Sequence, residues 1–193
     1  MDMQTIRTFI AIPVAVPVEM QDLINELRQE IGGSSNTIKW VDLSQLHFTL
    51  RFLGEIDASL VPAISRFLEE GVSGFYEKSV LLEGLGLFGP ARSPRIIWVG
   101  LRGDDFFDRL KKSIDASLGA LFPSGENQPF RPHLTIGRVK HAEDPVSLRN
   151  SIERFRKDFS ATVSLNRIIF YQSILQKKGP LYSPLNTIIL KQG

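Results

Sequence analysis

The stretch HFTL at residues 47–50 returns as HLTI at residues 133–136, 86 positions later. In a β-strand, residues i and i+2 point to one face and residues i+1 and i+3 to the other. Each copy therefore presents an imidazole and a threonine hydroxyl side by side, while two apolar side chains face the opposite way and anchor the strand. Two of the three histidines of the chain lie in this frame.

The segments around the two motifs follow the same order: helix, histidine strand, helix. Apolar residues at helical spacing predict helices over residues 18–31, 58–70, 105–121 and 144–155. The histidine strands span 47–53 and 133–139, and further strands are predicted over 8–12, 38–41, 79–88, 95–101, 159–173 and 186–190. We expect Gly54 to end the first histidine strand, Asp57 to cap the helix that follows it, and the pair Gly84 and Gly86 to mark a bulge. The repeated order predicts two similar lobes.

Composition limits the class of protein. The chain has 193 residues, 42% hydrophobic and 23% charged, which fits one soluble domain over residues 1–193. It has no cysteine, which excludes a thiol nucleophile and a disulfide framework and favours a cytoplasmic location. The apolar stretch 9–18, interrupted by Pro13 and Pro17, is too short to span a membrane. A net charge of +2 permits a nucleotide or an RNA end as ligand but does not indicate binding along long RNA.

The paired motifs suit phosphodiester hydrolysis. This reaction needs a base that activates water and an acid that protonates the leaving oxygen. Histidine does both near neutral pH, because its unperturbed pKa is about 6.5. The threonine hydroxyls can donate to the non-bridging oxygens, and His-x-Thr is not a metal-binding signature, so we expect neither metal nor cofactor. The structural alternative is a pair of core histidines, each with its threonine as hydrogen-bond partner. His141, the third histidine, is interpreted as a solvated loop residue.

The chain resembles the 2H phosphoesterase family, and within it the RNA 2′,3′-cyclic phosphodiesterase branch, which is also named for 2′-5′ RNA ligase activity. The resemblance extends over RTFIAI (7–12), LHFTLRFLGE (46–55), PRIIWVGL (94–101), FRPHLTIGR (130–138) and GPLYSPL (179–185). It implies an α+β fold, bilobal and duplicated, with two antiparallel-rich sheets around a central cleft and helices on the outside. It also implies hydrolysis of a terminal 2′,3′-cyclic phosphate on RNA or a nucleotide to a 2′-phosphate.

The resemblance also assigns roles to residues. The catalytic residues that it implies are His47, Thr49, His133 and Thr135. We assign His133 as the base that activates water and His47 as the acid for the leaving 3′ oxygen. Arg138 matches a basic residue that contacts phosphate, and Phe9 is a candidate wall for the base, with a core aromatic as its alternative role.

Strand alternation complicates the choice between two arginines. Arg51, at i+4 from His47, should share a face with the first motif and is a second candidate for substrate binding. Arg138, at i+5 from His133, should point away unless the strand bends near Gly137, which glycine permits. We rank Arg138 ahead of Arg51 because of the family match; for either arginine, the alternative is a surface charge.

The expected partners are RNA ends or nucleotides that carry a cyclic phosphate. We do not expect the protein to bind a membrane, and we expect it to be a monomer. Two other enzymatic hypotheses use the same residues: joining of RNA ends through a 2′-5′ bond, and hydrolysis of another cyclic phosphate. A hypothesis of a different class is a nucleotide-binding module that has lost turnover. Turnover of a 2′,3′-cyclic mononucleotide separates the enzymes from the binding module.

Overall fold

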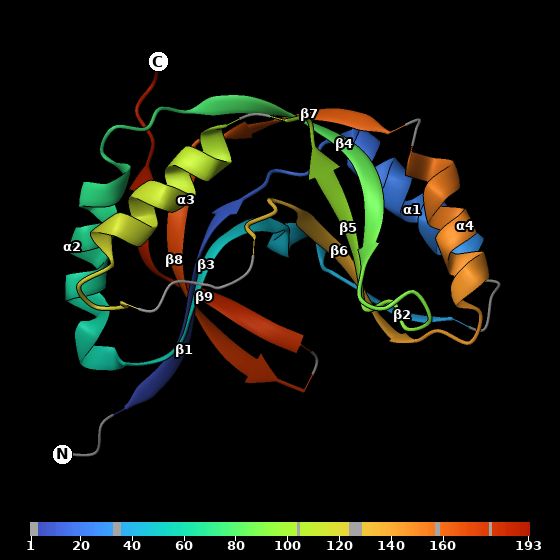
Figure 1. Cartoon of the computed structure of the whole chain (residues 1–193), viewed down its shortest axis with the longest axis horizontal. Helices are drawn as coiled ribbons and strands as arrows, with labels where there is room; N and C mark the ends of the chain where they lie inside the picture. Colours follow the sequence, from blue (N-terminus) through green and yellow to red (C-terminus); the bar gives the residue numbers. More distant parts are fainter. Residues whose placement is uncertain (1–3, 33–35, 104, 124–128, 157–158, 178) are drawn as a thin grey trace.

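The computed structural model describes residues 4–32, 36–103, 105–123, 129–156, 159–177 and 179–193. The fold is α+β, as the family resemblance implies. Its strands form a curled antiparallel sheet with helices packed on its outer side (Figure 1). The strands follow the order β7-β4-β5-β6-β3-β1-β8-β9, and β2 pairs with β6 beside this path. Among the described residues, no helix combines the length and the apolar character needed to cross a membrane.

Most helices and strands lie close to the predicted segments, but the strand predicted over 186–190 begins earlier, at Gly179. The strands are β1 (Thr5–Pro13), β2 (Thr37–Trp40), β3 (His47–Asp57), β4 (Lys78–Phe88), β5 (Ile96–Leu101), β6 (Leu134–His141), β7 (Ser160–Leu165), β8 (Arg167–Gln176) and β9 (Gly179–Ile189). The α-helices are α1 (Val18–Gly32), α2 (Val61–Val72), α3 (Phe106–Ser117) and α4 (Pro145–Arg156). The predicted strand 159–173 is in fact parts of two strands, because β7 ends at Leu165 and β8 begins at Arg167.

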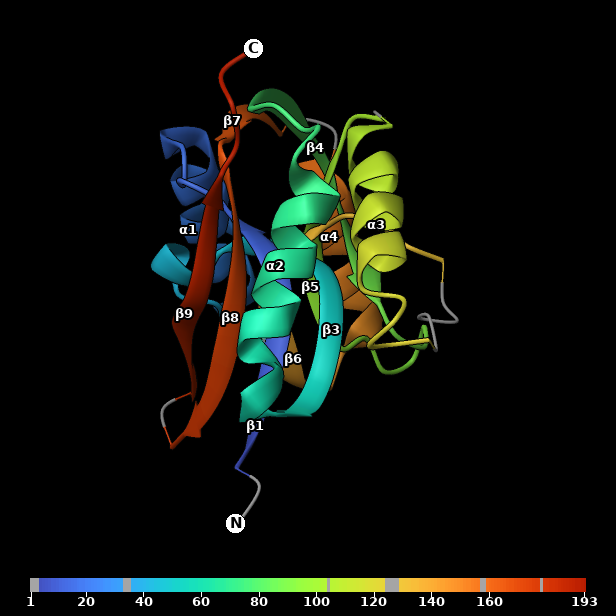
Figure 2. The same ribbon diagram turned by 90° about the vertical axis from the view of Figure 1, so that its left-hand side faces the viewer.

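The sheet consists of two half-sheets. The first half-sheet contains β1, β3, β8 and β9 and packs under α2 and α3; the second contains β2, β4, β5, β6 and β7 and packs under α1 and α4 (Figures 1 and 2). The two sheets that we expected are joined into one continuous sheet, because β3 and β6 meet at the register pair Phe48 and Leu134. The half-sheets are not consecutive pieces of chain, since α1 precedes β3 in the sequence but packs against α4 of the other half.

The apolar residues of both motifs face the helices. Phe48, Leu50, Leu134 and Ile136 are buried in the core, and the ring of Phe48 lies 4.8 Å from that of Phe107 on α3. The anchoring that strand alternation predicts is therefore confirmed. The side chains of the two histidines lie on the opposite side, which we call the histidine face.

Two of the three local expectations need correction. Gly54 does not end β3, which continues to Asp57; instead, Gly54 adopts a φ of +76° beside a register shift between β1 and β3. Asp57 caps a short 3₁₀ turn rather than α2, because its carboxylate accepts from the backbone N–H of Ser59 at 2.9 Å. The bulge predicted at the glycine pair is confirmed, since Gly84 has a φ of +75° where β4 shifts register against β5.

Candidate active site

The two motif histidines are held by the same contact. Nδ1 of His47 lies 2.7 Å from the carbonyl oxygen of Gln45, and Nδ1 of His133 lies 2.7 Å from the carbonyl oxygen of Arg131. A carbonyl oxygen only accepts, so each Nδ1 carries a proton and donates it. Each ring thus has Nε2 left to act as an acceptor when neutral or a donor when protonated. The alternative of core histidines predicted threonine as the ring partner, whereas the partner is a backbone carbonyl two residues earlier.

The two imidazoles are close enough to influence each other. Each histidine comes one residue before the register pair that joins the half-sheets. Burial lowers the pKa of His47 below its usual value of 6.5, and the charges of Arg138 and His133 lower it further, while the bond to the Gln45 carbonyl opposes this change. His47 is therefore mainly neutral in the free protein near pH 7.

A bulge in β3 places the side chain of Arg51 on the face of the strand opposite the histidines. Ala11 of β1 is opposite Thr49, but the next residue, Ile10, is opposite Arg51, so β3 contains one extra residue, Leu50. The extra residue reverses the alternation of faces. The expectation that Arg51 shares a face with Thr49 is therefore wrong.

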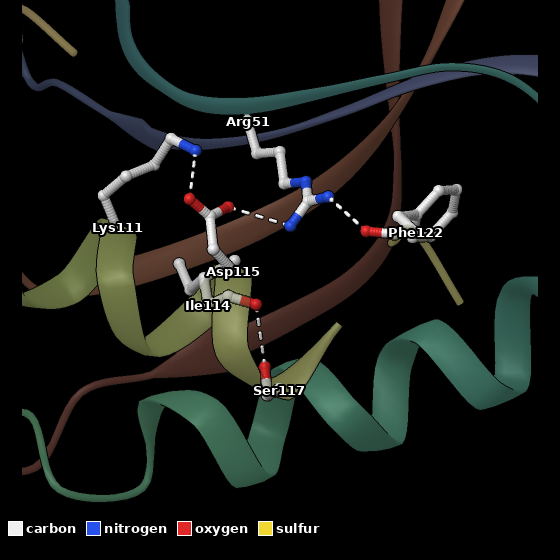
Figure 3. Close-up of polar contacts among 6 residues, drawn as sticks. All are labelled: Arg51, Lys111, Ile114, Asp115, Ser117 and Phe122. Carbon is white, nitrogen blue, oxygen red and sulfur yellow. Dashed lines mark hydrogen bonds and ion pairs between the residues drawn. The ribbon is translucent and has the colours of Figure 1, made fainter. Parts of the chain in front are cut away.

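Arg51 is part of an ion-pair network under α3. Its side chain is 4% exposed and its Nη1 lies 2.8 Å from Oδ1 of Asp115. Nη2 donates to the carbonyl oxygen of Phe122 at 3.3 Å, and Lys111 approaches the other carboxylate oxygen of Asp115 at 2.5 Å (Figure 3). These contacts tie β3 to α3, so Arg51 is no longer a candidate for substrate binding.

The same kind of bulge in β6 brings Arg138 to the histidine face. Trp98 of β5 is opposite Thr135, but the next residue, Ile97, is opposite Gly137, so Ile136 is extra. Arg138 then lies on the face of Thr135, and its charge acts on both His47 and Tyr182. The expected bend near Gly137 is thus confirmed. Glycine suits this position, because a Cβ would lie only 3.0 Å from Cγ2 of Ile38.

An aromatic cluster surrounds His47 on the first half-sheet. The ring of Phe9 lies 5.2 Å from that of His47, 5.1 Å from that of Tyr171 and 4.9 Å from that of Tyr182. Phe9 is only 3% exposed, so it supports the wall predicted for a base rather than forming its surface. Phe52, 6.1 Å from Phe9, is 60% exposed and presents its ring to solvent.

A smaller aromatic pair lies beside His133 on the second half-sheet. The ring of Phe88 meets His133 edge-on at 4.8 Å and stacks on Trp98 at 5.1 Å. Trp98 lies over Gly86, where a Cβ would be 2.2 Å from the indole ring. Only glycine at this position leaves room for the stacked pair.

Apart from Phe9, sequence reasoning missed these aromatic neighbours. One signal was available for Phe52, since it follows His47 by five residues as Arg138 follows His133. No comparable signal identified Tyr171 and Phe88, because their partners are set by tertiary pairing. Tyr182 lies in the segment GPLYSPL, and burial raises the pKa of its phenol. His141 is exposed, as expected, but it ends β6 rather than lying in a loop.

The chain is similar to known proteins over most of its length. Residues 16–174 match the model of the 2′-5′ RNA ligase superfamily. The chain is 34% identical to the RNA 2′,3′-cyclic phosphodiesterase of Thermotoga maritima, with 93% of this chain and 92% of that protein covered. It is 30% identical to the protein of the same name from Archaeoglobus fulgidus, with 93% and 97% covered.

Solved structures share the fold. A protein of Thermus thermophilus superposes with a TM-score of 0.77 at 24% identity, covering 96% of this chain and 98% of its own. Escherichia coli LigT in complex with 3′-AMP superposes with a TM-score of 0.74 at 22% identity, covering 98% of this chain and 100% of its own.

Proposed function

The chain belongs to the 2′-5′ RNA ligase superfamily, and we propose that it is a hydrolase that opens terminal 2′,3′-cyclic phosphates of RNA or nucleotides. The observation that carries this proposal is the pair of imidazoles, each with Nδ1 fixed on a carbonyl at 2.7 Å and each with Nε2 available. The two relatives described above support the same activity, because both carry the name RNA 2′,3′-cyclic phosphodiesterase and match over more than nine-tenths of this chain.

We propose an in-line displacement by water. One imidazole removes a proton from the attacking water as the oxygen bonds to phosphorus. The bond between phosphorus and the 3′ oxygen breaks, and the other imidazolium gives its proton to that oxygen. The product has a 2′-phosphate and a free 3′-hydroxyl. Thr49, Thr135 and Arg138 stabilise the charge on the non-bridging oxygens.

The surroundings of the two histidines support the assignment of roles. The aromatic cluster with the exposed ring of Phe52 lies beside His47, so a nucleobase stacked there puts the ribose on the side of His47. The leaving 3′ oxygen belongs to that ribose, and His47 is the acid. His133, on the half-sheet that carries Arg138, is the base.

The lowered pKa of His47 is compatible with the role of acid. A protonated imidazole of lower pKa releases its proton more readily to the leaving oxygen. In the free protein His47 is mainly neutral, but a bound phosphate anion stabilises the imidazolium and raises its pKa. Substrate binding thus favours the protonation state that the acid needs.

The decisive experiment is turnover of a 2′,3′-cyclic mononucleotide in excess chelator, with the product identified by phosphorus NMR. We expect the 2′-phosphate to accumulate without a divalent ion. A 3′-phosphate product would contradict the direction of attack, and activity that chelator abolishes and one divalent ion restores would contradict the metal-free mechanism. Binding without turnover would indicate a nucleotide-binding module.

We also propose that the chain works as a monomer in the cytoplasm. The absence of cysteine supports this location. Light scattering of the purified protein should give the mass of a single chain at the concentrations used for turnover. A mass of two chains would contradict the monomer.

A further inference from the structure

The imidazole of His133 has a second contact, with the ring of Phe88 at the end of β4. The two rings meet edge-on, at an interplanar angle of 88° and a centroid distance of 4.8 Å, which is a favourable geometry for an aromatic pair. The hydrogen bond from Nδ1 to the carbonyl of Arg131 fixes one atom of the imidazole, but by itself it still allows the ring to tilt about that atom. The contact with Phe88 restricts this tilt, so the two contacts together define the position of Nε2.

Phe88 is supported from behind by Trp98 of β5. Their rings stack at 5.1 Å with an interplanar angle of 28°. The indole occupies space that two glycines leave open, since a Cβ would lie 2.2 Å from Cζ2 at Gly86 and 3.1 Å from Cζ3 at Gly100. The indole N–H is buried and has no hydrogen-bond partner in the described part of the chain. Packing rather than hydrogen bonding therefore sets the position of Trp98, and through it that of Phe88.

The backbone fixes the point from which Phe88 projects. Phe88 is opposite Ile96 in the register of β4 with β5, and its carbonyl accepts from the backbone N–H of Arg95 at 2.8 Å. Gly89 follows with a φ of +111°, and a Cβ there would lie 3.0 Å from the backbone nitrogen of Arg95. The strand thus ends at Phe88 in a tight turn that suits glycine, and the ring is attached to a well-defined backbone.

His47 has the same two kinds of contact. Its Nδ1 lies on the carbonyl of Gln45, and the ring of Tyr182 on β9 meets the imidazole edge-on, at 88° and 5.3 Å. In both half-sheets the edge-on ring comes from a strand other than the one that carries the histidine. Because different strands supply the ring in the two cases, the combination serves the imidazoles rather than one local packing arrangement.

We propose that Phe88, supported by Trp98, is a positioning residue that holds the imidazole of His133 in the orientation in which Nε2 accepts the proton of the attacking water. The inference rests on the proposed function, since it concerns the proton transfer at His133. Proton transfer needs a short and aligned contact, so a tilted imidazole removes the proton less efficiently. Phe88 therefore acts on kcat and contributes nothing to substrate binding.

The test removes the ring of Phe88 and keeps an apolar side chain. Phe88→Leu and Phe88→Met both do this, while Phe88→Tyr retains the ring. Phe75→Leu is the matched control, because Phe75 is partly buried before the other end of β4 and also makes an edge-on contact, with Phe106 at 5.9 Å and 83°. Values of kcat and KM for a 2′,3′-cyclic mononucleotide are measured for each substitution, alone and combined with His133→Ala, and melting temperatures show that the variants are folded.

We expect Phe88→Leu and Phe88→Met to lower kcat about 3–15-fold with KM unchanged within about twofold, as for the loss of one aromatic contact to the catalytic group. Phe88→Tyr and Phe75→Leu should stay close to the unmodified protein. Combined with His133→Ala, the substitutions of Phe88 should leave the residual rate nearly unchanged, since no imidazole is left to position. An equal loss of kcat with and without His133 would overturn the proposal, and so would a rise in KM, which would show that Phe88 contacts the substrate.

Nitrogen NMR gives a readout that does not depend on turnover. At alkaline pH the neutral imidazole of His133 should carry its proton on Nδ1 in the unmodified protein, because the carbonyl of Arg131 accepts it. The share of this tautomer should fall in Phe88→Leu and stay high in Phe75→Leu; an unchanged share in Phe88→Leu would show that the ring does not hold the imidazole. If the unmodified protein does not turn over the cyclic mononucleotide, the proposed function fails, whereas the tautomer measurement still decides whether Phe88 positions His133.

Discussion

Strands β3 and β6 share a six-residue frame, His47–Phe52 in the first half-sheet and His133–Arg138 in the second. Both carry one extra residue directly after the threonine, Leu50 in one and Ile136 in the other. The two backbones therefore present positions one, three and six of the frame to the histidine face. The first two of these positions hold histidine and threonine in both strands.

The half-sheets differ at the sixth position of the frame. It is Phe52 in the first half-sheet, next to Phe9, which packs against Tyr171 and Tyr182. In the second half-sheet it is Arg138, which lines an open groove together with Arg95 and Lys140. The same bulge, one extra residue after the threonine, thus places an aromatic ring on one side of the paired imidazoles and a positive charge on the other. A nucleotide has the matching asymmetry, with an aromatic base at one end and an anion at the other.

Removing either imidazole should have the largest effect. We expect His47→Ala and His133→Ala each to lower kcat by about 10²–10⁴-fold, because each removes a positioned proton donor or acceptor. An aryl phosphodiester whose leaving group needs no proton should largely restore His47→Ala but not His133→Ala. Steady-state rates with both substrates provide the measurement.

Two checks accompany the histidine variants. Both should unfold near the melting temperature of the unmodified protein, and the double variant should be only slightly slower than the singles, since groups that act as a unit are not additive. Restoration of His133→Ala in place of His47→Ala would exchange the roles of acid and base. Near-normal turnover of either single variant would make that histidine structural.

The two arginines give the next largest effect and test the bulges. Arg138→Gln should lower kcat/KM by about 10–100-fold with little change in stability, because it removes a charge-assisted hydrogen bond to phosphate. Arg51→Gln should leave KM unchanged but lower the free energy of unfolding by about 1–3 kcal/mol, less than for a fully buried pair because Asp115 is partly exposed and keeps Lys111. Kinetics and denaturant unfolding of both variants are compared. A change of KM in Arg51→Gln would contradict the assigned face.

The exposed ring of Phe52 should have a smaller effect. Phe52→Ala removes a stacking surface for a base, and we expect KM for a cyclic mononucleotide to rise about 5–50-fold with kcat nearly unchanged. Tyr76→Ala is the matched control, because Tyr76 is also a half-exposed aromatic residue and lies before β4. Equal KM values for the two variants would show that the base lies elsewhere.

The pH dependence should show the smallest effect. With His47 as the acid, kcat/KM should fall as the pH rises through the pKa of His47 in the free protein, which lies below 6.5. The positive charge of Arg138 contributes to this lowering, so the alkaline limb should move to higher pH in Arg138→Gln. Profiles of kcat/KM for both proteins test this; an unchanged limb would separate Arg138 from the titration of His47.

The two histidine strands and their buried apolar residues follow from periodicity and spacing alone, whereas the α+β class is what the family resemblance implies. Strand alternation alone gives the wrong face for Arg51 and, without the bend near Gly137, for Arg138, since a single extra residue reverses the alternation and the position of such a bulge depends on the neighbouring strand. In β6, Gly137 follows the extra residue and indicates a possible bulge. In β3, Arg51 follows the extra residue Leu50, so no glycine indicates the bulge there. The aromatic neighbours of His47 depend on the pairing of β1 with β8, which brings together residues more than 150 positions apart, and on the pairing of β8 with β9.

The register pair of Phe48 and Leu134 would act as a pivot for any rotation between the half-sheets. It joins β3 to β6, with each half-sheet extending away from it beneath its own helices. Points close to a pivot travel little when the bodies on either side rotate, and distant points travel far. A rocking motion of the half-sheets would therefore change the reach from Phe52 to Lys140, and with it the fit of a long or short ligand. The spacing of the two imidazoles, each one residue from the pivot, would be nearly preserved.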